Sequence, residues 1–243
     1  MATIPGCGRS GGDVNLGFNG AFYAGAVKRF FGTPMTLWPL RNRLHVYVLP
    51  DDDLRSELGK RQRILKEFDY CSIQPAEYLH ATVQQFAVST EDTTAEQTAA
   101  FMDALKLLAA TTAPFSIQLA APKAEDWALG ARGTTTPEWK ALVEGVRTAA
   151  ARTINSGTPM PEAPNRPHIS LGYGLADGSS EDIQRASDDV TTNGLPPLKI
   201  KEMHFLAVHQ NIERGTYTWN ATSPVTLAGP PTRITDEPSP AQR

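Results

Sequence analysis

"YLHATVQQF" (residues 78–86) and "RPHISLGYG" (residues 166–174) share one four-residue pattern: a histidine, any residue, a hydroxyl residue and an aliphatic residue. The chain has only five histidines, and two of them stand in this frame. At ordinary composition, roughly one histidine in twenty falls in such a frame by chance. The tetrads at 80–83 and 168–171 therefore indicate a shared site rather than two unrelated histidines.

Each tetrad lies in a segment with the composition of a β-strand, where residues i and i+2 point to the same face. His80 and Thr82 therefore project together, and so do His168 and Ser170. The residues between and after them are apolar and point the other way. If the apolar faces pack under helices, two imidazoles and two hydroxyls are free to line one cleft.

This set of side chains suits the opening of a phosphodiester. The reaction needs a base to activate the attacking oxygen and an acid to protonate the leaving oxygen, and histidine does either near neutral pH. Two hydroxyl donors aimed at the non-bridging oxygens stabilise the charge of the transition state. A 2′,3′-cyclic phosphate presents both bridging oxygens to such a pair, and the scheme requires no metal and no other cofactor.

The hydrophobic pattern around the tetrads predicts alternating strands and helices. Strands are expected at 43–50, 78–88, 114–121, around the second tetrad, and as a closing pair at 198–210 and 215–227. Helices are expected at 51–68, after a Thr93–Glu96 capping box, after Thr136–Pro137, and at 179–190. This order predicts an α+β fold with two pseudo-symmetric lobes, each with a mainly antiparallel sheet and flanking helices, and an active-site cleft between them.

Composition shifts divide the chain into three parts. Residues 1–40 are rich in glycine without a sustained period, which predicts an irregular arm, and residues 229–243 predict a disordered, proline-rich tail. The two-lobed domain is expected at 41–228. A G-x-G-x-x-G pattern at Gly6–Gly11 lacks the strand before it and the helix after it that a dinucleotide site needs, so it is interpreted as part of the arm.

The overall composition limits the classes of function. The net charge of −3 argues against stable binding to long nucleic acid. Two cysteines without C-x-x-C spacing fit neither a disulfide framework nor a zinc site. No signal-peptide pattern and no long apolar run are present, so we expect a cytoplasmic protein without a membrane partner. The composition leaves the oligomeric state open.

The paired tetrads resemble those of the two-histidine (2H) phosphoesterase superfamily, over about residues 43–228. The resemblance implies a two-lobed α+β fold and metal-independent cleavage of 2′-linked or 2′,3′-cyclic phosphates. It also implies that His80 and His168 are the acid and base and that Thr82 and Ser170 hold the phosphate. Ligase-like relatives often carry a basic residue after the second tetrad, where this chain has the glycine-flanked Tyr173, and this difference favours a smaller substrate.

Strand alternation ranks further residues around this site. It places Tyr78 and Phe86 on the face of His80 as candidate substrate-binding residues. Tyr47 and His45 are expected to border the cleft, and Arg166 is expected to share the face of His168. Gly172 is expected to leave room for a ligand beside Ser170, whereas Tyr173 is expected to face the core. Arg132 is expected to be a solvated loop residue.

The sequence thus predicts a phosphoesterase acting on a 2′,3′-cyclic phosphate, a 2′-5′ linkage or a related small nucleotide. Its expected partner is a small nucleotide or an RNA end. Two alternatives stay open: a protein that binds nucleotides or RNA ends without turnover, and a pathway-specific enzyme acting on a non-RNA phosphoester. Pure binding does not need two titratable imidazoles, which favours the enzyme.

Overall fold

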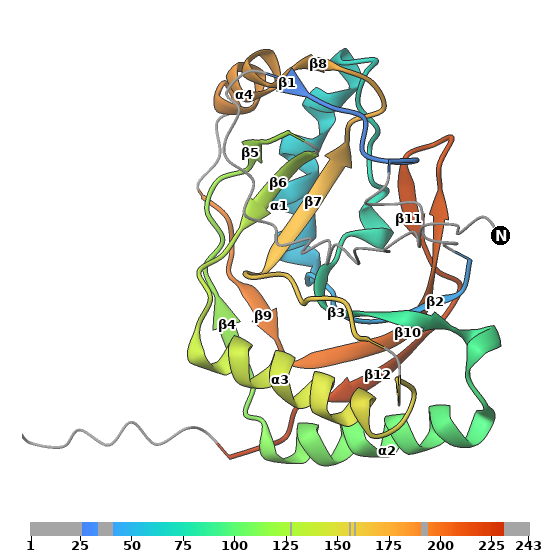
Figure 1. Ribbon diagram of the computed structural model, residues 1–243. Coiled ribbons are helices and arrows are strands. Elements are labelled where there is room, and N and C mark those ends of the chain that lie inside the picture. The colour runs from blue at the N-terminus through green and yellow to red at the C-terminus, as the bar shows by residue number, and fades with distance from the viewer. Residues whose placement is uncertain are drawn as a thin grey trace, which may run out of the picture.

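The computed structural model describes residues 26–33, 41–126, 128–155, 157, 159–190 and 194–230 (Figure 1). The α-helices in these residues are α1 (Asp52–Gln62), α2 (Ala95–Thr111), α3 (Pro137–Ala151) and α4 (Ser180–Asp188). Short 3-10 helices are η1 (Arg63–Glu67), η2 (Ala76–Tyr78) and η3 (Thr90–Asp92). Their combination with antiparallel strands confirms the α+β class.

One antiparallel sheet in the order β11-β10-β2-β3-β7-β6-β5 forms the centre of the fold, and β12 also pairs with β10. Its strands are β2 (Arg43–Val48), β3 (Ala81–Ser89), β5 (Lys123–Ala124), β6 (Ala128–Arg132), β7 (His168–Tyr173), β10 (Glu202–Asn211), β11 (Thr216–Thr218) and β12 (Thr222–Thr226). Two small sheets pair β1 (Ala26–Val27) with β8 (Gly178–Ser179) and β4 (Phe115–Ile117) with β9 (Leu198–Ile200). The two tetrads therefore lie on neighbouring strands of one continuous sheet.

Local capping sets where the helices begin. The Asp51 carboxylate accepts a hydrogen bond from the backbone N–H of Leu54, which starts α1 as expected. Thr136 caps α3 with a proline at its first position, also as expected. The predicted capping box of α2 was one residue early, because Thr94 and Gln97 form it.

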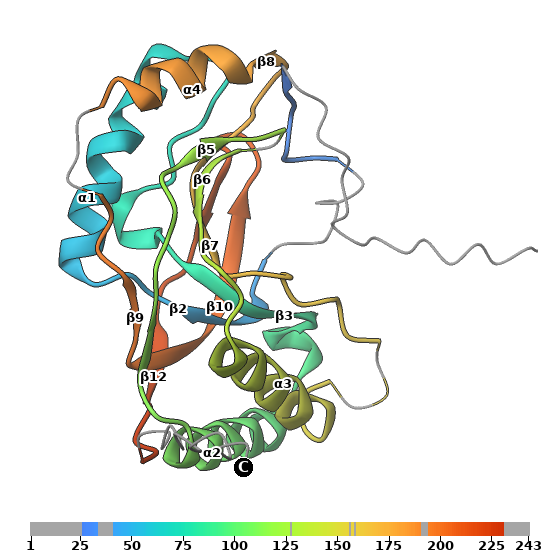
Figure 2. The same ribbon diagram turned by 90° about the vertical axis from the view of Figure 1, so that its left-hand side faces the viewer.

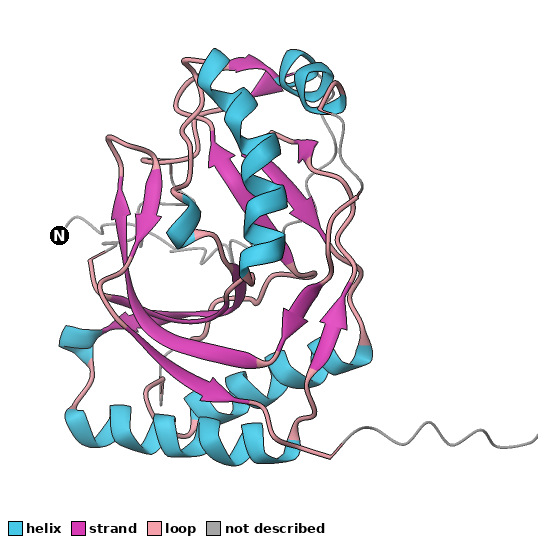
Figure 3. Ribbon diagram, turned by 180° about the vertical axis from the view of Figure 1, so that it is seen from behind, coloured by secondary structure: helices cyan, strands magenta, loops and turns pink. Residues whose placement is uncertain are grey.

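Helices α1 and α3 each pack against a strand that is not their neighbour in sequence. α1 follows β2 in sequence yet packs against β7, and α3 follows β6 yet packs against β3. Figure 2 shows α1 and α4 in the upper part of the molecule and α2 and α3 at its lower end. From behind, α1 crosses β6 and β7 (Figure 3). The apolar faces of both tetrad strands are thereby covered.

Two apolar clusters lie on opposite faces of the central sheet. The main core, between sheet and helices, contains the fully buried Ala81 and Ile169. A smaller cluster of Tyr47, Leu206, Val208 and Trp219 lies on the other face of β2 and β10. Side chains of β2 alternate between the two clusters, as expected for a strand that is buried on both faces.

Two loop predictions were wrong. Residues 26–33 of the expected arm include β1, which pairs with β8, and they bury Val27 and Phe31 in the domain. The segment around Arg132, which was expected to be a loop, contains the β5–β6 hairpin, whose second strand pairs with β7 along its whole length. Its alanine and glycine residues give a weak strand pattern, which explains the error. The Gly6–Gly11 pattern and residues 231–243 of the expected tail lie outside the described residues.

Candidate active site

The two tetrads meet where β3 pairs with β7. Ala81 and Ile169 are Cα partners in this antiparallel pair, and both side chains are fully buried in the main core. The antiparallel register therefore brings His80 opposite Ser170, and Thr82 opposite His168, on the other face of the sheet. Each imidazole has the hydroxyl of the other tetrad as its cross-strand neighbour.

A backbone carbonyl orients each imidazole. His80 Nδ1 lies 2.8 Å from the Tyr78 carbonyl oxygen, and His168 Nδ1 lies 3.2 Å from the Arg166 carbonyl oxygen. Since a carbonyl only accepts, Nδ1 carries the hydrogen and Nε2 keeps its lone pair for chemistry. His45 makes the same contact with the carbonyl of Arg43, so an extended backbone produces it and it does not mark a catalytic histidine by itself.

Burial lowers the pKa of both imidazoles. The pKa of His80 falls to about 4, mainly through desolvation and additionally through the charge of His168. Desolvation also lowers the pKa of His168, and the positive charges of Arg132 and Arg166 lower it further. Both imidazoles are therefore neutral near pH 7 in the free protein, and the effect of His168 on His80 indicates that the two rings are close.

A β-bulge in β3 removes one predicted residue from the site. Tyr47 pairs with Thr82 and Val46 pairs with Gln84, so the residue between Thr82 and Gln84 is extra and the alternation reverses after it. Phe86 consequently points into the main core, where its ring lies 5.4 Å from that of Phe101. The prediction that Phe86 shares the face of His80 was wrong.

A second bulge, in β7, brings in a residue that alternation had assigned to the core. Gly130 pairs with Ser170 and Leu129 pairs with Gly172, so the residue between Ser170 and Gly172 is extra. Tyr173 therefore returns to the site face, where burial raises the pKa of its phenol to about 12 and the Ser170 side chain beside it lowers that pKa. Gly172 instead faces the core side, where an added Cβ would overlap the Ser72 carbonyl oxygen, so it leaves no room for a ligand.

Aromatic rings surround His80. Tyr47 stacks on the imidazole with 4.0 Å between centroids and 13° between planes. Trp219 and Tyr217 meet the same imidazole edge-on, at 5.5 and 6.1 Å. The ring of Tyr78, a predicted site residue, packs against Trp219 with 4.9 Å between ring centroids. The carbonyl oxygen of Tyr78 contacts His80 Nδ1. The sequence reasoning missed Tyr217 and Trp219, although their i, i+2 spacing on a closing strand was a usable signal.

Two arginines lie beside His168. Arg132 is the Cα partner of His168 across β6 and β7, and its guanidinium forms an ion pair with Glu125. It is therefore a strand residue at the site rather than the solvated loop residue that the sequence predicted. Arg166 is exposed and lines a pocket of about 360 Å³ with Gly133, Thr134, Thr135 and Asn165.

The described part of the chain offers no obvious metal site. Among those residues, no group of three or more histidine, cysteine, aspartate or glutamate side chains is placed to hold a metal ion. Within the same residues, no helix combines the length and apolar character needed to cross a membrane.

Comparisons with known proteins identify the fold. No protein-family model and no curated protein matches the chain. Among solved structures, TT0787 of Thermus thermophilus matches with a TM-score of 0.56 and 17% identity, over 77% of this chain and 98% of that one. ATU0111 of Agrobacterium tumefaciens matches with a TM-score of 0.50 and 18% identity, over 76% of this chain and 84% of that one. E. coli LigT complexed with 3'-AMP scores 0.47 at 21% identity, over 76% and 99%, which is too low for an inference about this chain. The chain therefore has the fold of the Thermus protein TT0787.

Proposed function

We propose that this protein is a metal-independent phosphoesterase of the two-histidine type. Its substrate would be a 2′,3′-cyclic phosphate, a 2′-5′ linkage or a related small nucleotide phosphodiester. The reaction would be hydrolysis by general acid–base catalysis, with His80 and His168 as the acid and base.

The cross-strand arrangement at Ala81 and Ile169 carries this proposal. It supports a phosphoryl group bound on one face of the sheet, between two imidazoles and two hydroxyls. Thr82 and Ser170 would donate to the non-bridging oxygens, one from each strand. Hydrogen bonds aimed at oxygens whose charge grows in the transition state lower the barrier.

The proposed reaction is a direct displacement at phosphorus. One neutral imidazole takes a proton from water as the water oxygen bonds to phosphorus. The bond from phosphorus to the 2′- or 3′-oxygen breaks, and the other histidine, as imidazolium, gives that oxygen its proton. The phosphate anion would supply the charge that favours this imidazolium, since burial alone keeps both rings neutral. Proton return from base to acid through water completes the cycle.

The buried position of the His80 imidazole supports a small ligand. His80 is only 8% exposed and is enclosed by Tyr47, Tyr217 and Trp219. A small phosphodiester or a frayed RNA end fits such a recess more easily than a continuous strand. The positive charges of Arg132 and Arg166 beside His168 would attract its phosphate.

The test is turnover of 2′,3′-cyclic mononucleotides and 2′-5′-linked dinucleotides in EDTA. We expect turnover in the wild-type protein and its loss in His80→Gln and His168→Gln, with thermal unfolding confirming that each variant folds. His209→Gln, on β10, is the matched control and should retain activity. Loss of turnover in EDTA, or full activity in either tetrad variant, would refute the mechanism. Binding without turnover of any substrate would favour a binding protein.

A further inference from the structure

We propose that Tyr47 is a positioning residue that holds both functional side chains of the first tetrad. Its ring fixes the plane of His80, and its hydroxyl orients the hydroxyl of Thr82. This inference deepens the proposed function and relies on it only for the turnover part of the test.

The ring contact restrains His80 in a direction that its hydrogen bond does not. The Tyr78 carbonyl holds Nδ1 at 2.8 Å, which still permits the ring to tilt about that bond. Tyr47 covers one flat side of the imidazole at 4.0 Å and 13° between planes, so a tilt would break the stack. Trp219 and Tyr217 meet the imidazole only edge-on. Tyr47 is therefore the neighbour that sets the plane of the ring.

The hydroxyl contact follows from the strand register. Tyr47 and Thr82 are Cα partners across β2 and β3, and the Thr82 side chain lies close enough to the Tyr47 phenol to affect its pKa. Tyr47 is 2% exposed, and its burial raises the pKa of the phenol, so the hydroxyl stays protonated. When the phenol donates to Thr82 Oγ1, the hydrogen of Thr82 is free to donate to a phosphate oxygen.

Comparison with the second tetrad distinguishes the role of the Tyr47 ring from the role of its hydroxyl. The Ser170 side chain lowers the pKa of the Tyr173 phenol, as the Thr82 side chain does for Tyr47. Its ring contacts among the described residues are with Phe30, Phe31 and Tyr217, and none is with His168. A tyrosine hydroxyl thus lies beside each tetrad hydroxyl, whereas among the described residues stacking on a tetrad imidazole is seen at Tyr47 alone.

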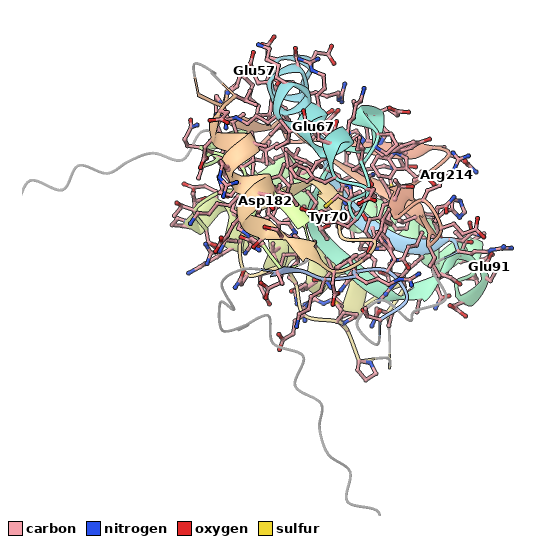
Figure 4. All side chains as sticks on the ribbon, turned by 90° about the horizontal axis from the view of Figure 1, so that it is seen from above. Glu57, Glu67, Tyr70, Glu91, Asp182 and Arg214 are labelled. Carbon is pink, nitrogen blue, oxygen red and sulfur yellow. The ribbon has the colours of Figure 1, made fainter. Side chains whose placement is uncertain are left out.

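Two substitutions separate the ring from the hydroxyl. Tyr47→Phe keeps the stack and loses only the hydroxyl, while Tyr47→Leu loses both. Tyr70→Phe is the matched control, because the Tyr70 hydroxyl donates to the Ser179 carbonyl away from the tetrads. Tyr70 lies on the face seen in Figure 4. Each variant is assayed by thermal unfolding, by NMR titration of the His80 imidazole and by turnover of a 2′,3′-cyclic mononucleotide.

We expect Tyr47→Phe to leave the His80 titration unchanged and to lower kcat about tenfold, the equivalent of ~1.4 kcal/mol. Tyr47→Leu should move the pKa of His80 upward, because water reaches the uncovered face, and should lower kcat further. The titratable neighbours His45 and His168 remain in both variants. Tyr70→Phe should change neither readout.

Two results would overturn the inference: full kcat in Tyr47→Phe, or an unchanged His80 titration in folded Tyr47→Leu. If the leucine variant fails to fold, Tyr47→Met preserves more of the side-chain volume and takes its place. If the wild type turns over none of the nucleotides, the proposed function fails. The His80 titration then still decides whether Tyr47 sets the environment of the imidazole.

Discussion

Substitution of Gly172 by alanine should destabilise the protein and, at the same time, disturb the second tetrad. An added Cβ would overlap the Ser72 carbonyl oxygen and approach Leu65 Cδ1 to 2.6 Å. Relief requires the segment around Ser72 to move away from β7, where it exchanges two hydrogen bonds with Tyr173. Overpacking costs about 1–3 kcal/mol and each lost hydrogen bond about 1 kcal/mol, so we expect the free energy of unfolding to fall by about 4 kcal/mol.

Urea denaturation measures this loss directly, against a total stability that is typically about 5–15 kcal/mol for a protein of this kind. Gly59→Ala is the matched control. Gly59 lies inside α1, and nothing stands within 4 Å of its added Cβ, so this change should raise stability by about 1 kcal/mol. A Gly172→Ala variant within about 1 kcal/mol of wild type would show that Ser72 does not pack against β7 as described.

Three further predictions concern the same site. The free energy of unfolding should fall by up to about 3 kcal/mol as the pH drops from ~6.5 to ~4, because the unfolded chain protonates His80 before the folded protein does; urea titrations of wild type and His80→Gln check this. Arg132→Gln should raise the pKa of His168 in an NMR titration, and an unchanged titration would contradict the proximity of the two residues. Phe31→Ala should cost about 3–5 kcal/mol, since its ring is 1% exposed against Tyr173 and Tyr217; a smaller loss would mean that segment 26–33 is not integral to the fold.

The tetrads could be predicted from sequence because the relevant geometry is local. His80 and Thr82, like His168 and Ser170, are two residues apart, and an extended backbone places such pairs on one face whatever the neighbouring strands do. The composition of these segments also predicted that they would be strands. Neither step depends on knowing which strand pairs with which.

Predictions failed where alternation had to be carried past a bulge. Phe86 is six residues from His80 and Tyr173 is three residues from Ser170, and one extra residue intervenes in each strand. A bulge is defined by hydrogen bonds to the partner strand, so local composition does not locate it. Gly172 hinted at an irregularity in β7, and nothing comparable marks the bulge after Thr82.

The antiparallel register makes the two tetrads equivalent, but their surroundings make them different. A two-fold rotation about the Ala81–Ile169 pair would exchange β3 with β7 and would therefore exchange the two imidazoles. His80, however, stacks on an aromatic ring, whereas Arg132 and Arg166 add positive charge around His168. In the proposed complex, a phosphate attracted by the arginines would lie between the imidazoles but nearer His168, with its organic portion toward the aromatic side. The environment would therefore give the proposed substrate a direction that the register alone does not, and that direction would decide which imidazole faces the leaving oxygen.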